Sequence, residues 1–359
     1  MQIGLVGLQY SGKTTLFNIL AGIKSEEGNQ KEEANIAVVK VPDTRLDKLT
    51  EIFNPEKQVN ATIEVYDIPG LRTSDEGKLR ITSAFLNNVK NNDALFYVIR
   101  NFENDSVPHP SNKIDPVSDI TFLETELLLT DMEFLEKRLE KIKKDIQKSK
   151  DDRLKQELPV IEKCYAHIEK ELPLRTLSLE DSEKKLLSGY QLLTLKPAAA
   201  AINFDENSTD TIESLTEKIS IEFKKYGLII LPFFAKIEEE LMELEDEDRS
   251  TFMADYGIKE SAKSKILRIL YQLLGLESFF TAGEDECRAW TIKKNYTAQQ
   301  AAGVIHTDFF NKFIRAEVVS YEHFMEHKSF SKCKENGTWR LEGKEYIVKD
   351  GDILTIRHS

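Results

Sequence analysis

The 359-residue sequence predicts an α/β fold with a helical hairpin inserted into it and a small β-rich domain after it. Three observations predict this architecture. Short apolar runs alternate with helical segments through the first 122 residues, which is typical of a parallel sheet with crossover helices. Apolar residues at helical spacing then interrupt this alternation. From about residue 279, β-like runs and turn signals dominate the chain.

The first predicted strand, Gln2–Val6, leads into a glycine-rich turn, Gly7–Thr14, and a helical apolar pattern follows at once. A tight glycine turn before a helix directs several backbone N–H groups to one place and favours phosphate binding there. Lys13 would reach the β- and γ-phosphates, and the Thr14 hydroxyl would bind Mg2+. The predicted phosphate-binding residues are Gly7, Gln9, Tyr10, Ser11, Gly12, Lys13, Thr14 and Thr15.

A second predicted strand, Thr62–Tyr66, ends at Asp67 in the sequence Asp-Ile-Pro-Gly. In phosphate-loop enzymes an aspartate at this place holds Mg2+, and the N–H of the following glycine, here Gly70, meets the γ-phosphate. Alone, such an aspartate is more often a turn former. With the loop at Gly7 before it, the sequence predicts Thr14 and Asp67 as the protein ligands of Mg2+.

Hydrolysis also needs a group that orients the attacking water. Ras-type GTPases carry a glutamine after the glycine, whereas Leu71 stands here and cannot fill that role. Within the chain the candidate is His109, in the loop after the predicted strand Ala94–Ile99, because neutral imidazole can accept a water proton near pH 7. The alternative is an exposed loop histidine between two prolines. Lys13 and His109 are thus the predicted catalytic residues.

From Ile120 to Ile146, and again from Leu154 to Leu172, apolar residues recur at helical spacing on either side of a polar break. Two long amphipathic helices joined by a short loop form an antiparallel hairpin. The many Glu and Lys residues of this hairpin are typical of a solvated helical face, and the alternative is a partner-binding arm. Strand-like runs resume after it, so the hairpin is an insertion within the α/β domain.

The loops after the strands Ala198–Ile202 and Leu228–Phe233 would contact the base. A guanine site presents Asn-Lys-x-Asp, whose aspartate accepts both guanine N–H groups. Here the first loop reads Asn203-Phe-Asp-Glu206, without the lysine and with a glutamate last, which makes adenine plausible. Ala235 and Lys236 lie in the second loop, whose backbone N–H groups are the expected donors.

Composition limits the partners. The net charge of −13 and the pI near 5.2 argue against broad nucleic-acid binding, and DNA is not expected as a partner. Three cysteines far apart predict reduced thiols in a cytoplasmic protein. The sequence shows no leader pattern and no run of 18 apolar residues, so we expect a soluble protein without a membrane partner.

In this order the residues resemble the YchF/Obg-like ATPase family of phosphate-loop proteins, and the resemblance covers nearly the whole chain. Its most specific stretches lie outside the phosphate loop. They are Phe102–Asp105, Tyr190–Pro197, Phe279–Gly283, Arg288–Ile292, Val304–Asp308, Phe313–Val318 and Trp339–Lys344. The resemblance implies a P-loop G domain at 1–122 and 190–278, an inserted helical (coiled-coil) hairpin at 123–189, and a small α+β TGS domain at 279–359.

The resemblance also implies ATP as the preferred nucleotide, with Asn203 and Glu206 matching the family's Asn-x-x-Glu and with Phe204 at the position whose backbone contacts adenine. It places Leu71 where the family has an apolar residue, and His109 where a histidine is its proposed substitute for the glutamine. Family members are linked to ribosomes, so the ribosome or ribosomal RNA is the expected partner, through the TGS domain and the hairpin.

The chain departs from the family in two places. Gln9, Tyr10 and Ser11 replace the usual Pro-Asn-Val, which puts potassium activation in doubt. Residues 30–32 read Gln-Lys-Glu near the place of the switch threonine, a possible second Mg2+ ligand. Binding of nucleotide should therefore survive better than turnover.

The sequence favours a Mg2+-dependent, slow ATP-hydrolysing switch protein. Three alternatives stay open at this point. The chain could be a nucleotide-gated binding protein with negligible hydrolysis, a GTP-preferring GTPase, or a small-molecule kinase, although no lid arginines or acceptor site can be found for the last.

Overall fold

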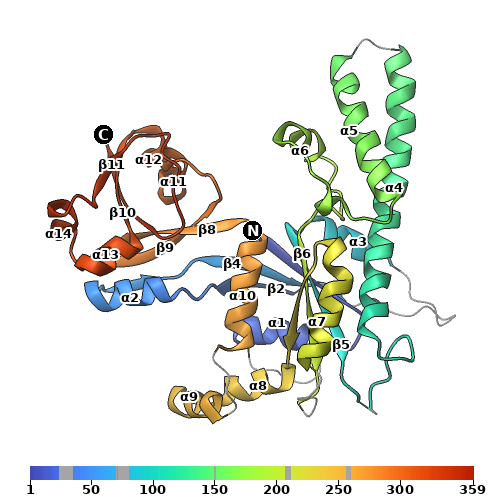
Figure 1. Ribbon diagram of the computed structural model, residues 1–359, viewed down its shortest axis with the longest axis horizontal. Helices are drawn as coiled ribbons and strands as arrows, with labels where there is room; N and C mark the ends of the chain where they lie inside the picture. The colour runs from blue at the N-terminus through green and yellow to red at the C-terminus, as the bar shows by residue number, and fades with distance from the viewer. Residues whose placement is uncertain are drawn as a thin grey trace. The chain divides into compact units, whose positions relative to one another are not determined.

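The computed structural model describes residues 1–23, 35–69, 71, 81–104, 106–148, 151–206, 212–255 and 260–359 (Figure 1). The chain forms two compact units. The first contains residues 1–37 and 64–263, and the second contains residues 38–63 and 264–359. Among the described residues, no helix combines the length and the apolar character that crossing a membrane requires.

A six-stranded sheet with the order β2-β4-β1-β5-β6-β7 carries the first unit. From β4 to β7 neighbouring strands pair in parallel, so their carboxyl ends and the loops after them lie along one edge, where α/β proteins bind ligands. The strands are β1 (Gln2–Val6), β2 (Asn35–Lys40), β4 (Thr62–Asp67), β5 (Ala94–Asn101), β6 (Ala198–Phe204) and β7 (Ile229–Phe233).

Helices follow these strands in the order that a parallel sheet requires. The helices of this part are α1 (Lys13–Ala21), α3 (Ser83–Lys90), α7 (Ile212–Phe223), α8 (Ala235–Glu243) and α9 (Asp246–Asp255), with the short helix η2 (Lys224–Tyr226) before β7. α10 (Ala262–Leu273) begins at the end of the first unit and lies mostly in the second. Every residue of β6 is buried, because its small alanines let helices pack closely on the sheet. α1 ends at Gly22, whose left-handed backbone (φ 69°) allows the closing bonds of the helix.

The predicted hairpin is formed by α4 (Pro116–Lys148) and α5 (Asp152–Ile168), drawn in green in Figure 1. η1 (Leu174–Thr176) and α6 (Asp181–Leu187) follow it. Buried apolar side chains form its seam, and the Arg138 guanidinium donates to both carboxylate oxygens of Glu157 at 2.6 and 2.7 Å. α4 begins four residues before the apolar pattern, because Asp115 caps it by accepting from the Ser118 N–H.

Two buried carboxylates fasten α4 to the rest of the first unit. Asp131 accepts hydrogen bonds from the backbone N–H groups of Leu193 and Thr194 at 2.9 and 2.7 Å. Glu124 accepts from the Tyr97 hydroxyl at 2.7 Å and from the Arg175 guanidinium at 2.6 Å. Since breaking a buried charged contact is strongly destabilising, these contacts hold the N-terminal half of α4 firmly against the rest of the first unit.

The second unit has its own six-stranded sheet with the order β11-β10-β12-β8-β9-β3. Its strands are β3 (Lys57–Val59), β8 (Leu276–Ala282), β9 (Glu286–Lys293), β10 (Phe313–Ser320), β11 (Arg340–Glu342) and β12 (Asp352–His358). Its helices are α2 (Thr44–Phe53), α11 (Ala298–Ile305), α12 (Thr307–Asn311), α13 (Tyr321–His327) and α14 (Phe330–Glu335). This C-terminal part is therefore mixed α and β.

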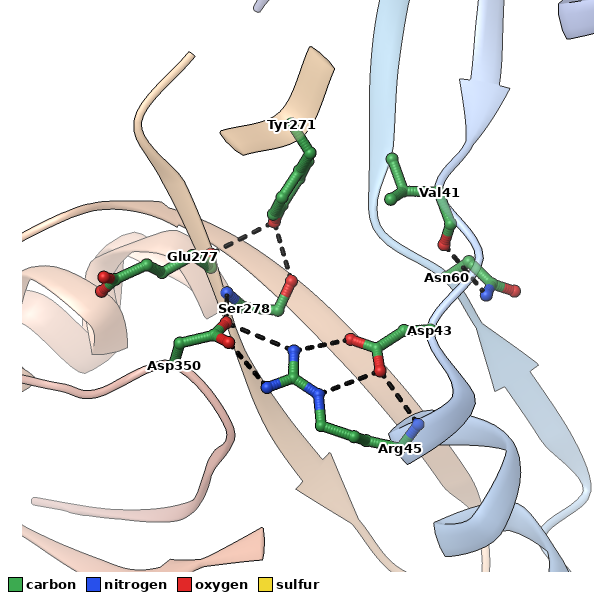
Figure 2. A network of polar contacts seen from close by, with 8 residues as sticks. All are labelled: Val41, Asp43, Arg45, Asn60, Tyr271, Glu277, Ser278 and Asp350. Carbon is green, nitrogen blue, oxygen red and sulfur yellow. Dashed lines mark hydrogen bonds and ion pairs between the residues drawn. The ribbon is translucent and has the colours of Figure 1, made fainter. Parts of the chain in front are cut away.

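Residues 38–63 are built into this second unit, which the sequence did not indicate. β3 extends the sheet by pairing in parallel with β9, and the ring of Phe53 stacks on that of Phe324 with centroids 5.3 Å apart. Arg45 lies between two carboxylates, with 2.8 Å to Asp43 and 2.7 Å to Asp350 (Figure 2). A segment far from the C-terminus in sequence is thus held there by pairing, stacking and charge.

Candidate nucleotide-binding site

The glycine-rich turn forms a tight loop between β1 and α1. Gly12 has a left-handed backbone (φ 94°), and a Cβ atom there would lie 2.4 Å from the Asn203 amide nitrogen. A Cβ at Gly7 would lie 2.4 Å from the carbonyl oxygen of Val98. Both positions therefore require glycine. Tyr10 also has a positive φ of 63°, which costs a non-glycine residue on the order of 1 kcal/mol, and such strained residues cluster at functional sites.

Lys13 is the buried cation of this loop, with 7% of its surface exposed. Its Nζ donates to the Leu8 carbonyl at 3.2 Å. Burial lowers the pKa of Lys13 from 10.5 to about 8, and the charge of Asp67 only partly opposes this. An ammonium group that is buried with so little compensation is stabilised when an anion such as a phosphate arrives.

The two predicted Mg2+ ligands meet, because the Thr14 hydroxyl donates to Asp67 Oδ2 at 2.8 Å. Burial raises the pKa of Asp67, while the hydrogen bond from Thr14 and the charge of Lys13 oppose the rise. A hydroxyl and a carboxylate are the oxygen donors that Mg2+ accepts, with phosphate oxygens and water completing its shell. The described residues contain no group of three or more His, Cys, Asp or Glu side chains that could hold a metal ion.

Leu71 is tied to the phosphate loop by backbone hydrogen bonds. Its N–H donates to the Gly7 carbonyl at 3.3 Å, and its carbonyl accepts from the Gln9 N–H at 3.1 Å. Its side chain is buried and apolar, so it offers no group that could orient water. Gly70 and residues 30–32, for which the sequence made predictions, lie outside the described residues.

Asn203, at the end of β6, joins two loops of the site. Its amide donates to the Ser11 carbonyl at 3.2 Å, and its Oδ1 accepts from the Ala235 N–H at 3.1 Å. The side chain is 2% exposed, so both of its polar groups serve protein backbone. Asn203 therefore fixes the distance between the phosphate loop and the second base loop.

The remaining base-loop residues also lie together. The buried ring of Phe204 packs against Phe234, with centroids 6.0 Å apart. The Lys236 ammonium donates to Glu206 at 2.5 Å, and this hydrogen bond raises the pKa of Lys236. The carboxylate that replaces the guanine-reading aspartate thus has a cation as its partner.

His109 is buried, with 7% of its surface exposed, which sets aside the exposed-loop alternative. Its Nε2 lies 3.1 Å from Asp119 Oδ2, on the first turn of α4. Burial lowers the pKa of His109, and the nearby charge of Arg100 lowers it further, so the imidazole is neutral at pH 7. Burial and the neighbouring Asp115 raise the pKa of Asp119 to about 7, against the effect of Arg100.

The structure therefore brings Lys13, Thr14 and Asp67 into one group and joins Asn203 to the phosphate loop. Among the described residues, the hydrogen bonds of the His109 ring are to Ser111 and Asp119, and none is to Lys13, Thr14 or Asp67. Sequence reasoning missed Asp119. The only signal was its place one residue before the predicted helical pattern and ten residues after His109.

A parallel sheet whose first strand leads through this glycine loop to a lysine and a hydroxyl, with an aspartate at the end of the adjacent strand, defines a P-loop nucleoside triphosphatase of the GTPase fold. A family model described as a 50S ribosome-binding GTPase matches residues 2–152. A second, for the C-terminal part of YchF GTPases and described as a protein of unknown function, matches residues 276–359. The chain belongs to the YchF family.

Full-length relatives carry this assignment. The chain is 41% identical to the ribosome-binding ATPase YchF of Haemophilus ducreyi, over 99% of this chain and 98% of that protein. It is 38% identical to the protein of the same name from Bacillus subtilis, with 99% and 98% covered. The solved structure of the Schizosaccharomyces pombe YchF GTPase superimposes with a TM-score of 0.87 at 31% identity, covering 99% and 97%. The expected family and fold class are confirmed.

Proposed function

We propose that this chain is a Mg2+-dependent protein that binds ATP, hydrolyses it slowly and uses the reaction as a conformational switch on the ribosome, in the cytoplasm. The observation that carries the proposal is the meeting of Thr14 and Asp67 beside the buried Lys13. The names of its full-length relatives, which are ribosome-binding ATPases, support the choice of ATP and of the partner.

Lys13 and the N–H groups of the phosphate loop would stabilise the charge that develops on the phosphates. Thr14 and Asp67 would hold Mg2+, which neutralises phosphate charge when bound. His109 would orient the attacking water. The hairpin 123–189 and a TGS domain at 279–359 would contact the ribosome. The segments 1–122 and 190–278 would supply the nucleotide-binding domain, apart from residues 38–63 and 264–278, which lie in the second compact unit.

Calorimetric titration with ATP and with GTP, each with Mg2+, tests the base preference. We expect ATP to bind at least about tenfold more tightly, since Glu206 is paired with Lys236 and the lysine of the guanine motif is absent. Restoring the motif with Phe204→Lys and Glu206→Asp should move the preference toward GTP. Glu206→Asp alone is the milder variant, because Phe204 is part of the core. Tighter binding of GTP by the unaltered chain would overturn the base assignment.

Co-sedimentation with purified ribosomes tests the switch. We expect the bound fraction to differ between ATP, ADP and nucleotide-free protein, because a switch needs different affinities in its two states. Binding that is equal in all three conditions would reject a nucleotide-controlled switch.

A further inference from the structure

Both ring nitrogens of His109 have partners inside the protein. The side chains of His109 and Asp119 are each 4% exposed, and Nε2 lies 3.1 Å from Asp119 Oδ2. On the other side of the ring, Nδ1 accepts the Ser111 backbone N–H at 3.2 Å and lies 2.8 Å from the Ser111 hydroxyl. The ring is therefore enclosed between its own loop and the first turn of α4.

These contacts assign the protons of the ring. Because the Ser111 N–H donates to Nδ1, that nitrogen is an acceptor. Nε2 therefore carries the proton of the ring, and the Nε2–H group donates a hydrogen bond to Asp119. The Ser111 hydroxyl in turn donates to the Lys113 carbonyl at 2.9 Å. A neutral imidazole accepts from water only through its unprotonated nitrogen, and here that nitrogen is already engaged. In this conformation His109 cannot orient an attacking water.

The surroundings show where the two sides of the contact are anchored. Arg100 donates to the carbonyls of Phe102 and Val107 at 3.0 and 2.9 Å and so fastens the start of the loop to β5. α4 is fastened to the sheet through Glu124, five residues beyond Asp119. Between these two anchors, residues 108–113 carry His109 and Ser111. Their contact with Asp119 is the restraint that has to be released.

We propose that Asp119 is a positioning residue that holds His109 in a resting place, from which residues 108–113 must release the imidazole before it can act on water. The inference rests on the proposed function, because His109 needs this release only if the chain hydrolyses ATP. The rival role, in which Asp119 orients a working imidazole as the aspartate of a serine protease does, requires the other nitrogen to face the reaction. Ser111 occupies that nitrogen.

The sign of one substitution separates the two roles. The test is made at pH 8, above the Asp119 pKa of about 7, where Asp119→Asn keeps the size of the side chain and removes the charge that strengthens the bond to Nε2–H. Release of a restrained imidazole should raise the single-turnover rate of ATP hydrolysis, without ribosomes, by about fivefold, with ATP affinity unchanged. The double variant with His109→Ala should show no gain. An unchanged or lower rate in Asp119→Asn, or a gain that survives in the double variant, would overturn the proposal.

Asp115→Asn is the matched control. This carboxylate also lies at the start of α4, where it caps the helix and pairs with Lys113, but the hydrogen bonds of the His109 ring in the described residues are to Ser111 and Asp119. Because Asp115 raises the pKa of Asp119, its loss favours the charged form of Asp119, so this variant should not raise the rate although it weakens the helix end. If Asp119→Asn does not fold, Asp119→Ala is the second variant, and Arg100 would keep its two carbonyl partners in both.

A measurement that does not depend on chemistry separates failure of the inference from failure of the proposed function. Nitrogen-15 spectra of labelled histidine should show His109 of the nucleotide-free protein with its proton on Nε2, and Asp119→Asn should shift the Nε2 signal because its charged acceptor is lost. Signals that are the same in both proteins would refute the restraint even in a chain that hydrolyses ATP. The expected change in a chain without any hydrolysis would refute the proposed function alone.

Discussion

Lys13 in the phosphate loop and Arg45 in the second unit are cations in opposite situations. Within the described part of the chain, the buried Lys13 ammonium makes one hydrogen bond, to the Leu8 carbonyl, and burial lowers its pKa to about 8. Burial also opposes the charge of Arg45, but its hydrogen bonds to Asp43 and Asp350 outweigh burial and raise its pKa (Figure 2). The protein therefore stabilises the charge of Arg45 by itself and leaves that of Lys13 to be stabilised by something else.

This difference separates a binding site from a structural contact. The two carboxylates that bind Arg45 accept further hydrogen bonds. Asp350 accepts from the Ser278 N–H at 2.8 Å, and Asp43 caps α2 by accepting from the Arg45 N–H at 2.9 Å. Each charged group there is satisfied inside the second unit. At Lys13 the compensation is incomplete, as the raised pKa of Asp67 beside it also indicates. Perturbed pKa values of this kind mark candidate functional sites.

The largest expected effect comes from removing the uncompensated cation. Lys13→Met keeps the length of the side chain and should lower the rate of ATP hydrolysis by about 10³-fold, since one lost stabiliser of transition-state charge costs about this much. Single-turnover hydrolysis measures it. The control is Lys48→Met, which removes an exposed lysine of α2. A rate within about threefold of the unaltered protein would mean that the phosphates lie elsewhere.

Replacing Lys13 and replacing Arg45 should change the stability of the protein in opposite directions. The lowering of the Lys13 pKa from 10.5 to about 8 corresponds to about 3 kcal/mol, so Lys13→Met should stabilise the nucleotide-free protein by up to about this amount. Arg45→Met should destabilise the second unit by about 1 kcal/mol, a modest figure because Arg45 and Asp350 are partly exposed.

Calorimetric unfolding measures the first change. Fluorescence measures the second, because both tryptophans of the chain, Trp290 and Trp339, belong to the second unit. Lys344→Met, at an exposed position of that unit, is the control for Arg45. Two variants that both lost stability would contradict the distinction between the two cations.

Asn203 tests whether a fully bonded side chain within the site is structural or functional. Asn203→Ala removes the links to Ser11 and Ala235, and the loops that it joins should lose their spacing. We expect ATP affinity to fall about tenfold, the effect of one or two lost buried hydrogen bonds. Asn87→Ala, at an exposed position of α3, is the control in the same titration. An unchanged affinity would show that the phosphate loop keeps its shape without Asn203.

The sequence predicted the parts of the fold whose signals are local. Apolar runs predicted β1, β4, β5, β6 and β7 of the first sheet, and helical spacing over many residues predicted the hairpin. β2, whose Ile36 and Val38 are exposed, was not predicted. The place of residues 38–63 could not be predicted in this way. β3 is only three residues long, and its partner β9 lies far along the chain, so neither turn chemistry nor periodicity connects them.

The site divides along the same line. Lys13, Thr14 and Asp67 could be grouped because the ends of adjacent parallel strands lie at one edge. The burial of His109 could not be predicted, because its flanking prolines indicated an exposed loop and because its partner Asp119 belongs to the next helix. Contacts set by tertiary packing are not contained in a local pattern.

The smallest expected effect is a pH dependence that follows from Lys13 alone. Its pKa in the free protein is lowered to about 8, and bound phosphates favour its charged form. At pH 7 about nine-tenths of the free protein carries the charge, and at pH 8.5 about a quarter does. At the higher pH, most of the protein must therefore add a proton to Lys13 when ATP binds. ATP affinity should fall about fourfold from pH 7 to pH 8.5.

Titration calorimetry in two buffers with different ionisation enthalpies measures this proton directly. Above pH 8 each bound ATP should take up most of one proton, whereas at pH 7 uptake by Lys13 should be close to zero. Thermal unfolding of Arg45→Met beside the unaltered protein extends the comparison, since Arg45 stays charged throughout this range and its contribution to stability should not change with pH. An ATP affinity that is constant from pH 7 to pH 8.5 would mean that Lys13 is fully charged before ATP binds. The phosphate loop would then compensate its cation as completely as the second unit compensates Arg45.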